Sequence, residues 1–170
     1  ELETYAGVTV YMTRNDNTSP NTDREQRAKF AAEKGANVLV SIHINSYGKG
    51  YTSAHGAEVY YPNSNYNSTV SGQGQNLSAV ILKQLTALGL ADRGIKIRNS
   101  KDGETYPDGS LADYLGINKY AKLYGYPGIL IEHAYANNVS DAANYLTTDA
   151  QLQRLGVADA TGIAQYFGLQ

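Results

Sequence analysis

The sequence has 170 residues, a formal net charge of −2 and an apolar fraction that is ordinary for a globular protein. This length suffices for one domain with its own core, and the absence of a Lys/Arg cluster argues against a nucleic-acid binder. No apolar run reaches the length of a membrane span, and the absence of cysteine excludes disulfides, a thiolate nucleophile and cysteine-bound zinc.

The chain begins with a strand pattern and then a helix pattern. Residues 8–14 alternate and are rich in β-forming residues, which predicts a strand. Thr22 and Glu25 have the spacing of a capping box, and Gly35 is a common stop signal. A helix is therefore predicted over 23–34.

The middle of the chain continues to alternate between strands and helices. Residues 37–44 form a continuous apolar run, typical of a strand buried on both faces of a parallel sheet. A strand is predicted over 57–61, and a helix over 75–88, where the apolar residues fall on one helical face. A short strand is predicted over 95–98, and residues 111–124 favour a short helix followed by extended chain.

The last part of the chain holds a second buried apolar run, over 126–135. Thr148 and Gln151 form another capping box, which opens a helix through about Phe167. Because strands alternate with helices, the predicted fold class is α/β, with a mostly parallel twisted sheet flanked by helices in three layers. With no repeat or linker, a single domain over 1–170 is predicted.

Both buried runs end in polar, titratable residues. His43 and Asn45 end the first run, and Glu132 and His133 end the second. If the two strands are parallel neighbours, these groups face one crevice at the carboxyl end of the sheet. A neutral imidazole beside a carboxylate suits a zinc site or a general acid–base pair. A hydrogen-bonded core histidine and a structural ion pair explain the same positions equally well.

Five blocks carry a resemblance to a known family: "VYMTRND", "REQRAKFAAEKGANVLVSIHINS", "HGAEVYY", "ADRGIKIRNS" and "YPGILIEHAYANN". In this order and spacing they resemble the zinc-dependent N-acetylmuramoyl-L-alanine amidases of the Amidase_3 family, especially Gram-positive, clostridia-like members. The resemblance implies a phosphorylase/hydrolase-like fold and cleavage of the amide between N-acetylmuramic acid and L-alanine of the stem peptide. It also implies zinc as cofactor, peptidoglycan as partner, and a secreted, autolysin-like enzyme that is associated with the cell wall.

The resemblance assigns roles to individual residues. His43 matches the family's zinc-binding histidine in "SIHxN", and Glu132 matches its catalytic glutamate. Zinc would activate a water molecule, and Glu132 would take its proton and pass it to the leaving nitrogen. The residues proposed to bind substrate or shape the site are Asn45, His55, Arg98 and Asn99. Arg14 and Arg27 also match family positions, and for both a structural role is favoured.

The sequence departs from the family pattern before Val8. Family members begin with a strand that ends in a "GHGG"-like turn, whose His is a zinc ligand, and a ligand Glu follows. Residues 1–7 correspond to the end of the next helix and match neither ligand, so an N-terminally truncated domain of low stability is expected. His55 is expected to be a loop residue, and His133 should point away from the face of Glu132. Neither is expected to replace the missing ligands, and we expect the missing strand to belong to a longer chain or to another chain.

Two other functions stay open. One is a wall-binding module that lacks a metal. The other is a glycosidase that uses paired carboxylates from a loop with four acidic residues. The acidic residues of that loop are Asp102, Glu104, Asp108 and Asp113. The oligomeric state is not predicted.

Overall fold

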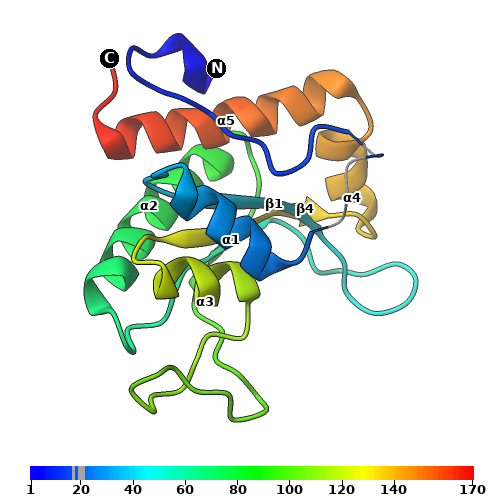
Figure 1. Ribbon diagram of the computed structural model, residues 1–170. Helices are drawn as coiled ribbons and strands as arrows, with labels where there is room; N and C mark the ends of the chain where they lie inside the picture. The colour runs from blue at the N-terminus through cyan, green and yellow to red at the C-terminus, as the bar shows by residue number, and fades with distance from the viewer. Residues whose placement is uncertain (17, 19–21) are drawn as a thin grey trace.

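The computed structural model describes residues 1–16, 18 and 22–170, and within these it is a three-layer α/β domain (Figure 1). A four-stranded sheet among these residues lies between two layers of helices, which confirms the predicted fold class. The strands are β1 (Leu39–Asn45), β2 (Ala57–Tyr60), β3 (Asp92–Lys96) and β4 (Gly128–Tyr135). The longer helices are α1 (Arg24–Glu33), α2 (Ser68–Ala87), α3 (Gly116–Leu123) and α5 (Asp149–Phe167). Short helical turns are η1 (Leu2–Thr4), α4 (Val139–Asp141) and η2 (Ala142–Leu146).

The strands lie in the order β1-β4-β2-β3. β1 and β4 are parallel, as are β2 and β3, whereas the central pair β4 and β2 is antiparallel. The sheet is therefore mostly parallel, as predicted, with one reversal at its centre. Because of this reversal, the start of β2 lies beside the carboxyl end of β4.

The core lies mainly between the sheet and the pair α2 and α5. Val59 and Ile131 are fully buried there, together with Ile81 of α2. The opposite face of the sheet is covered by α1 and α3, where Ala121 and Tyr126 are buried. Burial on both faces makes β4 a continuous apolar strand, as its sequence predicts.

β1 is not buried on both faces, contrary to the prediction for residues 37–44. Ile42 is 65% exposed and Ile44 is 41% exposed. β1 pairs with β4 on one side only, and no described residue pairs with its other edge. An apolar run predicts a strand, but the strand is buried on both faces only where helices or neighbouring strands cover both of them.

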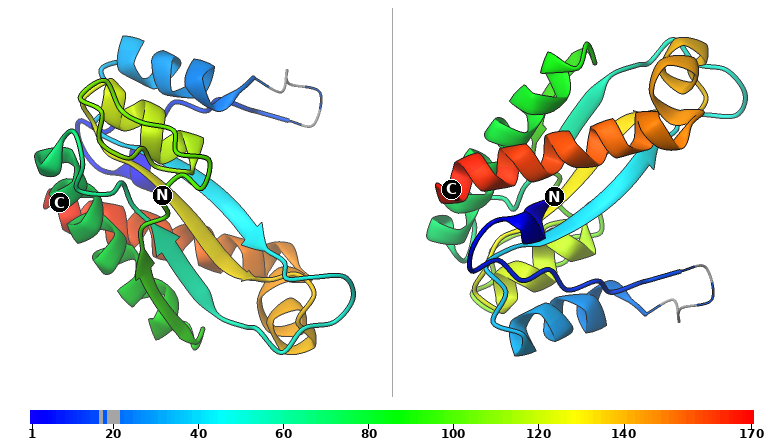
Figure 2. Two further views of the ribbon diagram at one scale, coloured as in Figure 1. Left: turned by 90° about the horizontal axis from the view of Figure 1, so that it is seen from below. Right: turned by 90° about the horizontal axis from the view of Figure 1, so that it is seen from above.

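Residues 8–14 do not form a strand, contrary to the prediction. They run extended beside the free edge of β1, without pairing with any strand that the structure describes (Figure 2). This segment instead packs on α1, where the rings of Tyr11 and Phe30 meet edge to face at 6.3 Å. Alternating β-forming residues make a strand only where another strand supplies backbone hydrogen bonds.

Helix starts also differ from the predictions. α1 is capped by Asp23, which forms a capping box with Gln26, one residue beyond the predicted pair. α2 begins at Ser68, seven residues before the predicted start, with Asn67 as its cap. Its first turns are rich in Ser and Gly; a side chain at Gly74 would meet Pro62 at 2.8 Å, so packing selects a weak helix former there.

The remaining elements follow the sequence more closely. β2, α3 and α5 lie within or near their predicted ranges, and Thr148 and Gln151 form the predicted capping box. β3 lies over 92–96, three residues before the predicted start. Among the described residues, the helices are too short or too polar to cross a lipid bilayer.

Candidate active site

Three polar side chains form a row across one face of the sheet. His43 on β1 is the register partner of Glu132 on β4, and Glu132 is the register partner of Glu58 on β2. Register partners on adjacent strands point to the same face. The polar row, defined as His43, Glu132 and Glu58, therefore lies where the carboxyl ends of β1 and β4 meet the start of β2.

Glu132 is the least satisfied carboxylate of the polar row. Its Oε2 is buried and has no hydrogen-bond partner in the part of the chain that the structure describes. Burial raises the pKa of Glu132 to about 7, with a smaller contribution from the negative charge of Glu58. A carboxyl group with a pKa near neutrality is suited to both accept and donate a proton.

Glu58, in contrast to Glu132, has hydrogen-bond partners for both carboxylate oxygens. It is buried, and its Oε1 accepts hydrogen bonds from Asn45 Nδ2 at 3.1 Å and from the Tyr60 hydroxyl at 2.9 Å. Its Oε2 accepts hydrogen bonds from Arg93 Nε at 2.9 Å and from Lys96 Nζ. Burial acts to raise the pKa of Glu58, but the bonds from Lys96 and Arg93 outweigh it and lower the pKa. Glu58 is thus an ionised carboxylate at neutral pH.

Glu58 was not predicted as a site residue, although it lies in "HGAEVYY", one of the five blocks that carry the family resemblance. The signal was a single charged residue between Ala57 and Val59 in a short apolar strand. Such a residue is rarely buried without a partner. Arg93 and Lys96, in the following strand, are those partners.

His43 is a neutral imidazole in this arrangement. Burial first, then the positive charges of Arg24 and His133, lower the pKa of His43. Its Nε2 lies 3.0 Å from Ser41 Oγ. The neutral form is the one that binds metal ions.

A complete zinc site is not assembled from the residues described. These contain no group of three or more His, Asp or Glu side chains arranged to hold a metal ion. Catalytic zinc usually has three protein ligands, and His43 is the one present that matches the family. The donor set therefore does not fit a resident zinc ion on its own.

His133 points to the other face of the sheet from Glu132, as predicted. Its Nε2 lies 2.7 Å from Asp159 Oδ2 on α5, and its Nδ1 lies 3.0 Å from the carbonyl oxygen of His43. Burial acts to lower the pKa of His133, but Asp159 and the His43 carbonyl outweigh it and raise the pKa. This side chain ties β1 and β4 to α5 beneath the site.

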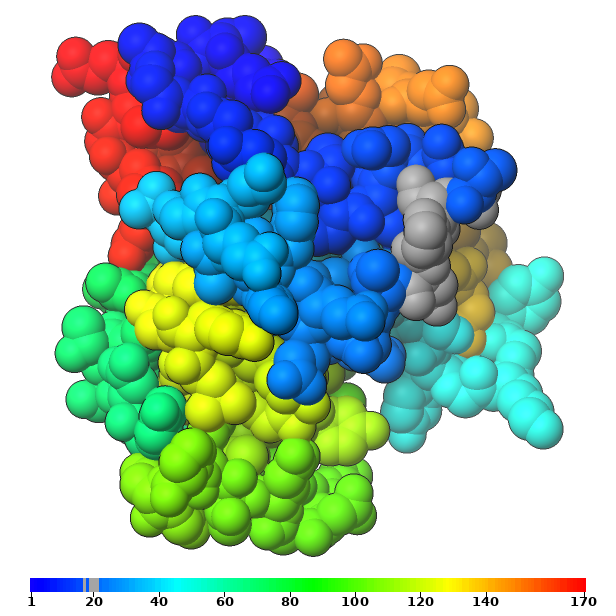
Figure 3. All heavy atoms as spheres, viewed as in Figure 1, coloured from blue at the N-terminus to red at the C-terminus, as the bar shows by residue number. Residues whose placement is uncertain are grey.

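Two of the other predicted site residues lie near the polar row. Asn45 joins it through the hydrogen bond to Glu58. His55 is exposed in the loop 46–56, which precedes β2 and stands out from the body of the domain (Figure 3). Its ring Nδ1 lies 3.0 Å from the carbonyl oxygen of Ser53.

Arg98 and Asn99 lie farther away, beyond the end of β3 and toward the amino end of β4. The Arg98 guanidinium lies 4.0 Å from the centre of the Tyr114 ring. Asn99 accepts a hydrogen bond from Asn63 Nδ2 at 2.9 Å. Both residues follow β3 instead of lying at the carboxyl ends of β1 and β4, but the positive charge of Arg98 acts on Tyr60, whose hydroxyl bonds Glu58.

The two arginines at family positions differ in their contacts. Arg27 donates hydrogen bonds to Thr13 Oγ1 at 2.6 Å and to the carbonyl oxygen of Thr22 at 3.1 Å. These bonds tie α1 to the extended segment 8–14, which supports the structural role. Arg14 is exposed on that segment.

A buried polar cluster anchors the long loop 99–114. The fully buried Lys122 Nζ lies 2.9 Å from Asp113 Oδ2 and 2.7 Å from Asn63 Oδ1. The Tyr106 hydroxyl donates to Asp113 Oδ2 at 2.6 Å. The loop is thereby fixed at its base by satisfied buried groups.

Three of the four acidic residues of this loop have structural partners. Asp113 belongs to the buried cluster, Glu104 pairs with Lys119 at 2.6 Å, and Asp108 accepts hydrogen bonds from the backbone N–H and the hydroxyl of Ser110. These contacts support a structural role for the loop acids over paired catalytic carboxylates.

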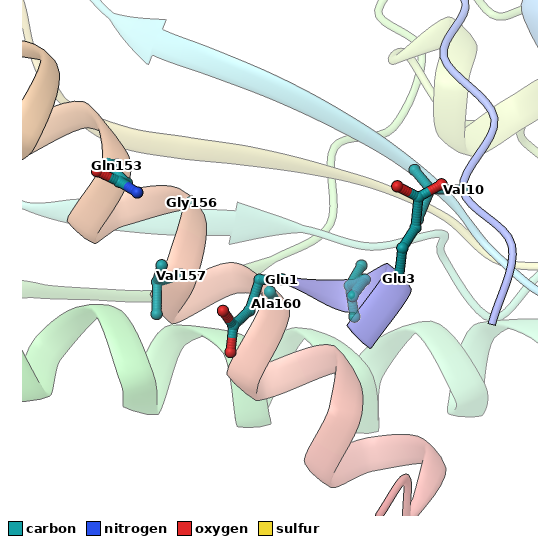
Figure 4. Close-up of a pocket in the computed structure, with 8 residues that line it drawn as sticks. Glu1, Glu3, Val10, Gln153, Gly156, Val157 and Ala160 are labelled. Atoms are coloured by element: carbon teal, nitrogen blue, oxygen red, sulfur yellow. The ribbon is translucent and has the colours of Figure 1, made fainter. Parts of the chain in front are cut away.

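A shallow pocket lies elsewhere, between the amino-terminal segment and α5 (Figure 4). It is lined by residues such as Glu1, Val10 and Val157. None of the residues of the polar row lines it. The candidate active site is therefore the row at the strand ends, where the titratable groups lie.

The fold and the polar row define an α/β domain with acid–base groups where the carboxyl ends of β1 and β4 meet the start of β2. The family model of the N-acetylmuramoyl-L-alanine amidases, Amidase_3, matches residues 1–165. The chain belongs to this family, which confirms the resemblance found in the sequence.

Solved structures with a similar fold include amidases. Cwp6 from Clostridium difficile has a TM-score of 0.76 and 28% identity, over 97% of this chain and 23% of its own. The catalytic domain of the N-acetylmuramoyl-L-alanine amidase CwlV from Bacillus (Paenibacillus) polymyxa var. colistinus has a TM-score of 0.73 and 27% identity, over 99% of this chain and 78% of its own. An N-acetylmuramoyl-L-alanine amidase from Clostridium difficile 630 has a TM-score of 0.69 and 23% identity, over 98% and 76%. No curated protein matches the chain.

Proposed function

We propose that this domain is a peptidoglycan hydrolase that cleaves the amide between N-acetylmuramic acid and L-alanine of the stem peptide. Family membership supports this reaction, and amidases are among the structures with a similar fold. The observation that carries the proposal is Glu132 at the strand ends, a carboxyl group with a pKa of about 7 and a buried oxygen that has no hydrogen-bond partner among the described residues. We place the protein outside the cell, at the wall, because that is where this substrate lies.

Glu132 has the properties that amide hydrolysis requires of an acid–base group. As a carboxylate it takes a proton from the attacking water, and as a carboxylic acid it gives that proton to the leaving nitrogen of L-alanine. A pKa near 7 makes both forms accessible at neutral pH. Glu58 stays ionised beside it and holds Asn45 in place.

Zinc is the cofactor that the family implies, and when bound it polarises the amide carbonyl and activates water. We propose His43 as one of its ligands. Because the described residues do not provide a cluster of three ligands, the proton transfers that we propose involve Glu132 alone.

The incomplete ligand set favours one alternative, a peptidoglycan-binding module that does not cleave. Such a module would keep the polar row as part of a groove. It would bind wall material and release nothing from it.

Digestion of purified peptidoglycan sacculi tests the proposal, with zinc added and zinc content per chain measured in parallel. We expect new amino groups of L-alanine, and a loss of about 100-fold or more in their release for Glu132→Gln. Glu33→Gln is the control, because Glu33 is exposed on α1, with 63% of its side chain accessible. Wall binding without release would support the binding module, and new reducing ends would support the glycosidase.

A further inference from the structure

Next to the polar row, β3 presents two cations on the same face of the sheet. Arg93 and Lys96 both contact Glu58 Oε2, yet their side chains are 32% and 34% exposed, whereas that of Glu58 is 4% exposed. The carboxylate is therefore covered, and the two positively charged groups above it reach solvent.

The charges of Arg93, Lys96 and Glu58 do not sum to zero. Two positive charges, from Arg93 and Lys96, face the single negative charge of Glu58, so the group has a net charge of +1. The other oxygen of Glu58 is already occupied by Asn45 and Tyr60. A guanidinium carries five N–H donors and an ammonium three, so both cations have more donors than Glu58 Oε2 takes up.

The two cations are held in place before any ligand arrives. Lys96 is fixed by its bond to Glu58, and the Arg93 guanidinium lies 5.0 Å from the centre of the Tyr135 ring. The other acid on this strand, Asp92, accepts a hydrogen bond from the backbone N–H of Gly94. Fixed donors lose little side-chain entropy on binding, and arginine is well suited to recognise a carboxylate.

The distance between Glu132 and the two cations, Arg93 and Lys96, determines which residue of a bound peptide can reach them. β3 lies two strands from β4 in the sheet, and adjacent strands are about 4.8 Å apart, so the cations lie up to about 10 Å from the strand of Glu132. Two to three residues of extended peptide, at about 3.3–3.6 Å each, cover that span. A stem peptide whose first amide lies at Glu132 would thus bring its second residue near Arg93 and Lys96.

We propose that Arg93 and Lys96 form a subsite for a free carboxylate on the stem-peptide residue that follows L-alanine. The inference rests on the proposed function, since it takes the cleaved amide to lie at Glu132. The second residue of such a peptide, D-glutamate linked through its side chain, has an α-carboxyl group that is either free or amidated. The subsite selects the free carboxylate, because the uncharged amide cannot compensate the surplus positive charge.

Two matched probes test this subsite by titration calorimetry: muramyl-L-alanyl-D-glutamate and its α-amide, muramyl-L-alanyl-D-isoglutamine. All proteins carry Glu132→Gln, so that neither probe is hydrolysed. We expect the acid to bind about tenfold more tightly than the amide, the ratio that one charge-assisted hydrogen bond provides. Lys96→Met and Arg93→Gln should each reduce this ratio toward one, and Lys96→Arg should keep it.

Lys29→Met is the control, because Lys29 is an exposed lysine on α1 whose side chain is 63% accessible. It should leave the ratio unchanged. If Lys96→Met fails to fold because Glu58 is left with one cation, the triple variant Glu58→Gln, Lys96→Met, Arg93→Gln leaves neither a poorly paired buried carboxylate nor a surplus positive charge, and its acid-to-amide ratio should be close to one.

Equal binding of acid and amide, or a preference that survives both Lys96→Met and Arg93→Gln, overturns the subsite and leaves the proposed function standing. Failure of both probes to bind also overturns it. If the wild-type protein then releases no L-alanine amino groups from sacculi, the proposed function has failed as well, and the two failures are distinguished by that assay.

Discussion

Glu58 and Glu132 are neighbouring carboxylates that the protein holds in different protonation states. Glu58 accepts hydrogen bonds from four side chains, two of them cationic, and its pKa is lowered. Glu132 lies opposite it with one oxygen unpartnered among the described residues, and its pKa is raised to about 7. Environments that move two carboxyl pKa values apart are typical of acid–base sites.

This difference predicts a pH dependence of stability. Because the pKa of Glu132 is raised on folding, its contribution is fully present below its usual pKa of 4.5 and is lost as pH rises through about 7. After discounting for partial exposure, we expect wild type to lose about 1–2 kcal/mol more than Glu132→Gln between pH 5 and pH 8. Urea unfolding of both proteins at the two pH values measures this difference. Parallel pH profiles would show that Glu132 ionises normally in the folded protein.

Part of the site could be predicted from the sequence, because a polar residue after an apolar run indicates the end of a strand. His43 and Glu132 each follow an apolar run, and the structure places them in register on adjacent strands. Glu58 was missed because its importance depends on the antiparallel pairing of β2 with β4, which no local pattern reveals. Arg98 and Asn99 were predicted to bind substrate from a loop expected to border the groove, and they follow the end of β3, which lies toward the amino end of β4.

At the scale of elements, α5 and α2 pack closely, and two glycines of α5 report on that packing. A side chain at Gly162 would lie 2.8 Å from the Cα of Ile81, a backbone atom of α2 that cannot move alone. A side chain at Gly156 would meet nothing within 4 Å. Both residues lie in the same helix, so their intrinsic preference for helix is the same.

We therefore expect opposite effects of one substitution at these two positions. Gly162→Ala should lower the free energy of unfolding by about 1–3 kcal/mol, because it overpacks the contact with α2. Gly156→Ala should raise it by about 0.5–1 kcal/mol, the gain from a better helix former. Thermal or urea unfolding of the two variants checks this, and a gain at both positions would mean that the helices separate easily.

Elements with a strong local signal were predicted well, and those that depend on neighbours were not. The capping box at Thr148 opens α5 as predicted, and the apolar run of β4 is buried on both faces. The segment 8–14 has the alternation of a strand, but it runs past the free edge of β1 without pairing with any strand among the described residues. The start of α2 was missed because Gly74 is chosen for its contact with Pro62, against its helix propensity.

At the scale of the whole molecule, the main feature is the free edge of β1. In the part of the chain that the structure describes, this edge has no strand partner, and Ile42 and Ile44 beside it are exposed. Figure 2 shows the extended segment 8–14 running past the edge without closing it. An open, apolar edge is a template for pairing with another chain, and it lowers the stability of the sheet.

We expect the 170-residue chain to unfold at a low temperature and to associate as its concentration rises. Ile42→Lys should reduce this association, because a charge on an edge strand opposes pairing with a second strand. It should change the free energy of unfolding by less than about 0.5 kcal/mol, since Ile42 is 65% exposed. Light scattering over a concentration series measures the association.

Val139→Lys is the matched control, because Val139 is 66% exposed on α4 and does not belong to β1. If both lysine variants reduce association equally, general surface hydrophobicity is responsible and the edge is not; a cooperative melt well above mesophilic temperatures would contradict the expected low stability.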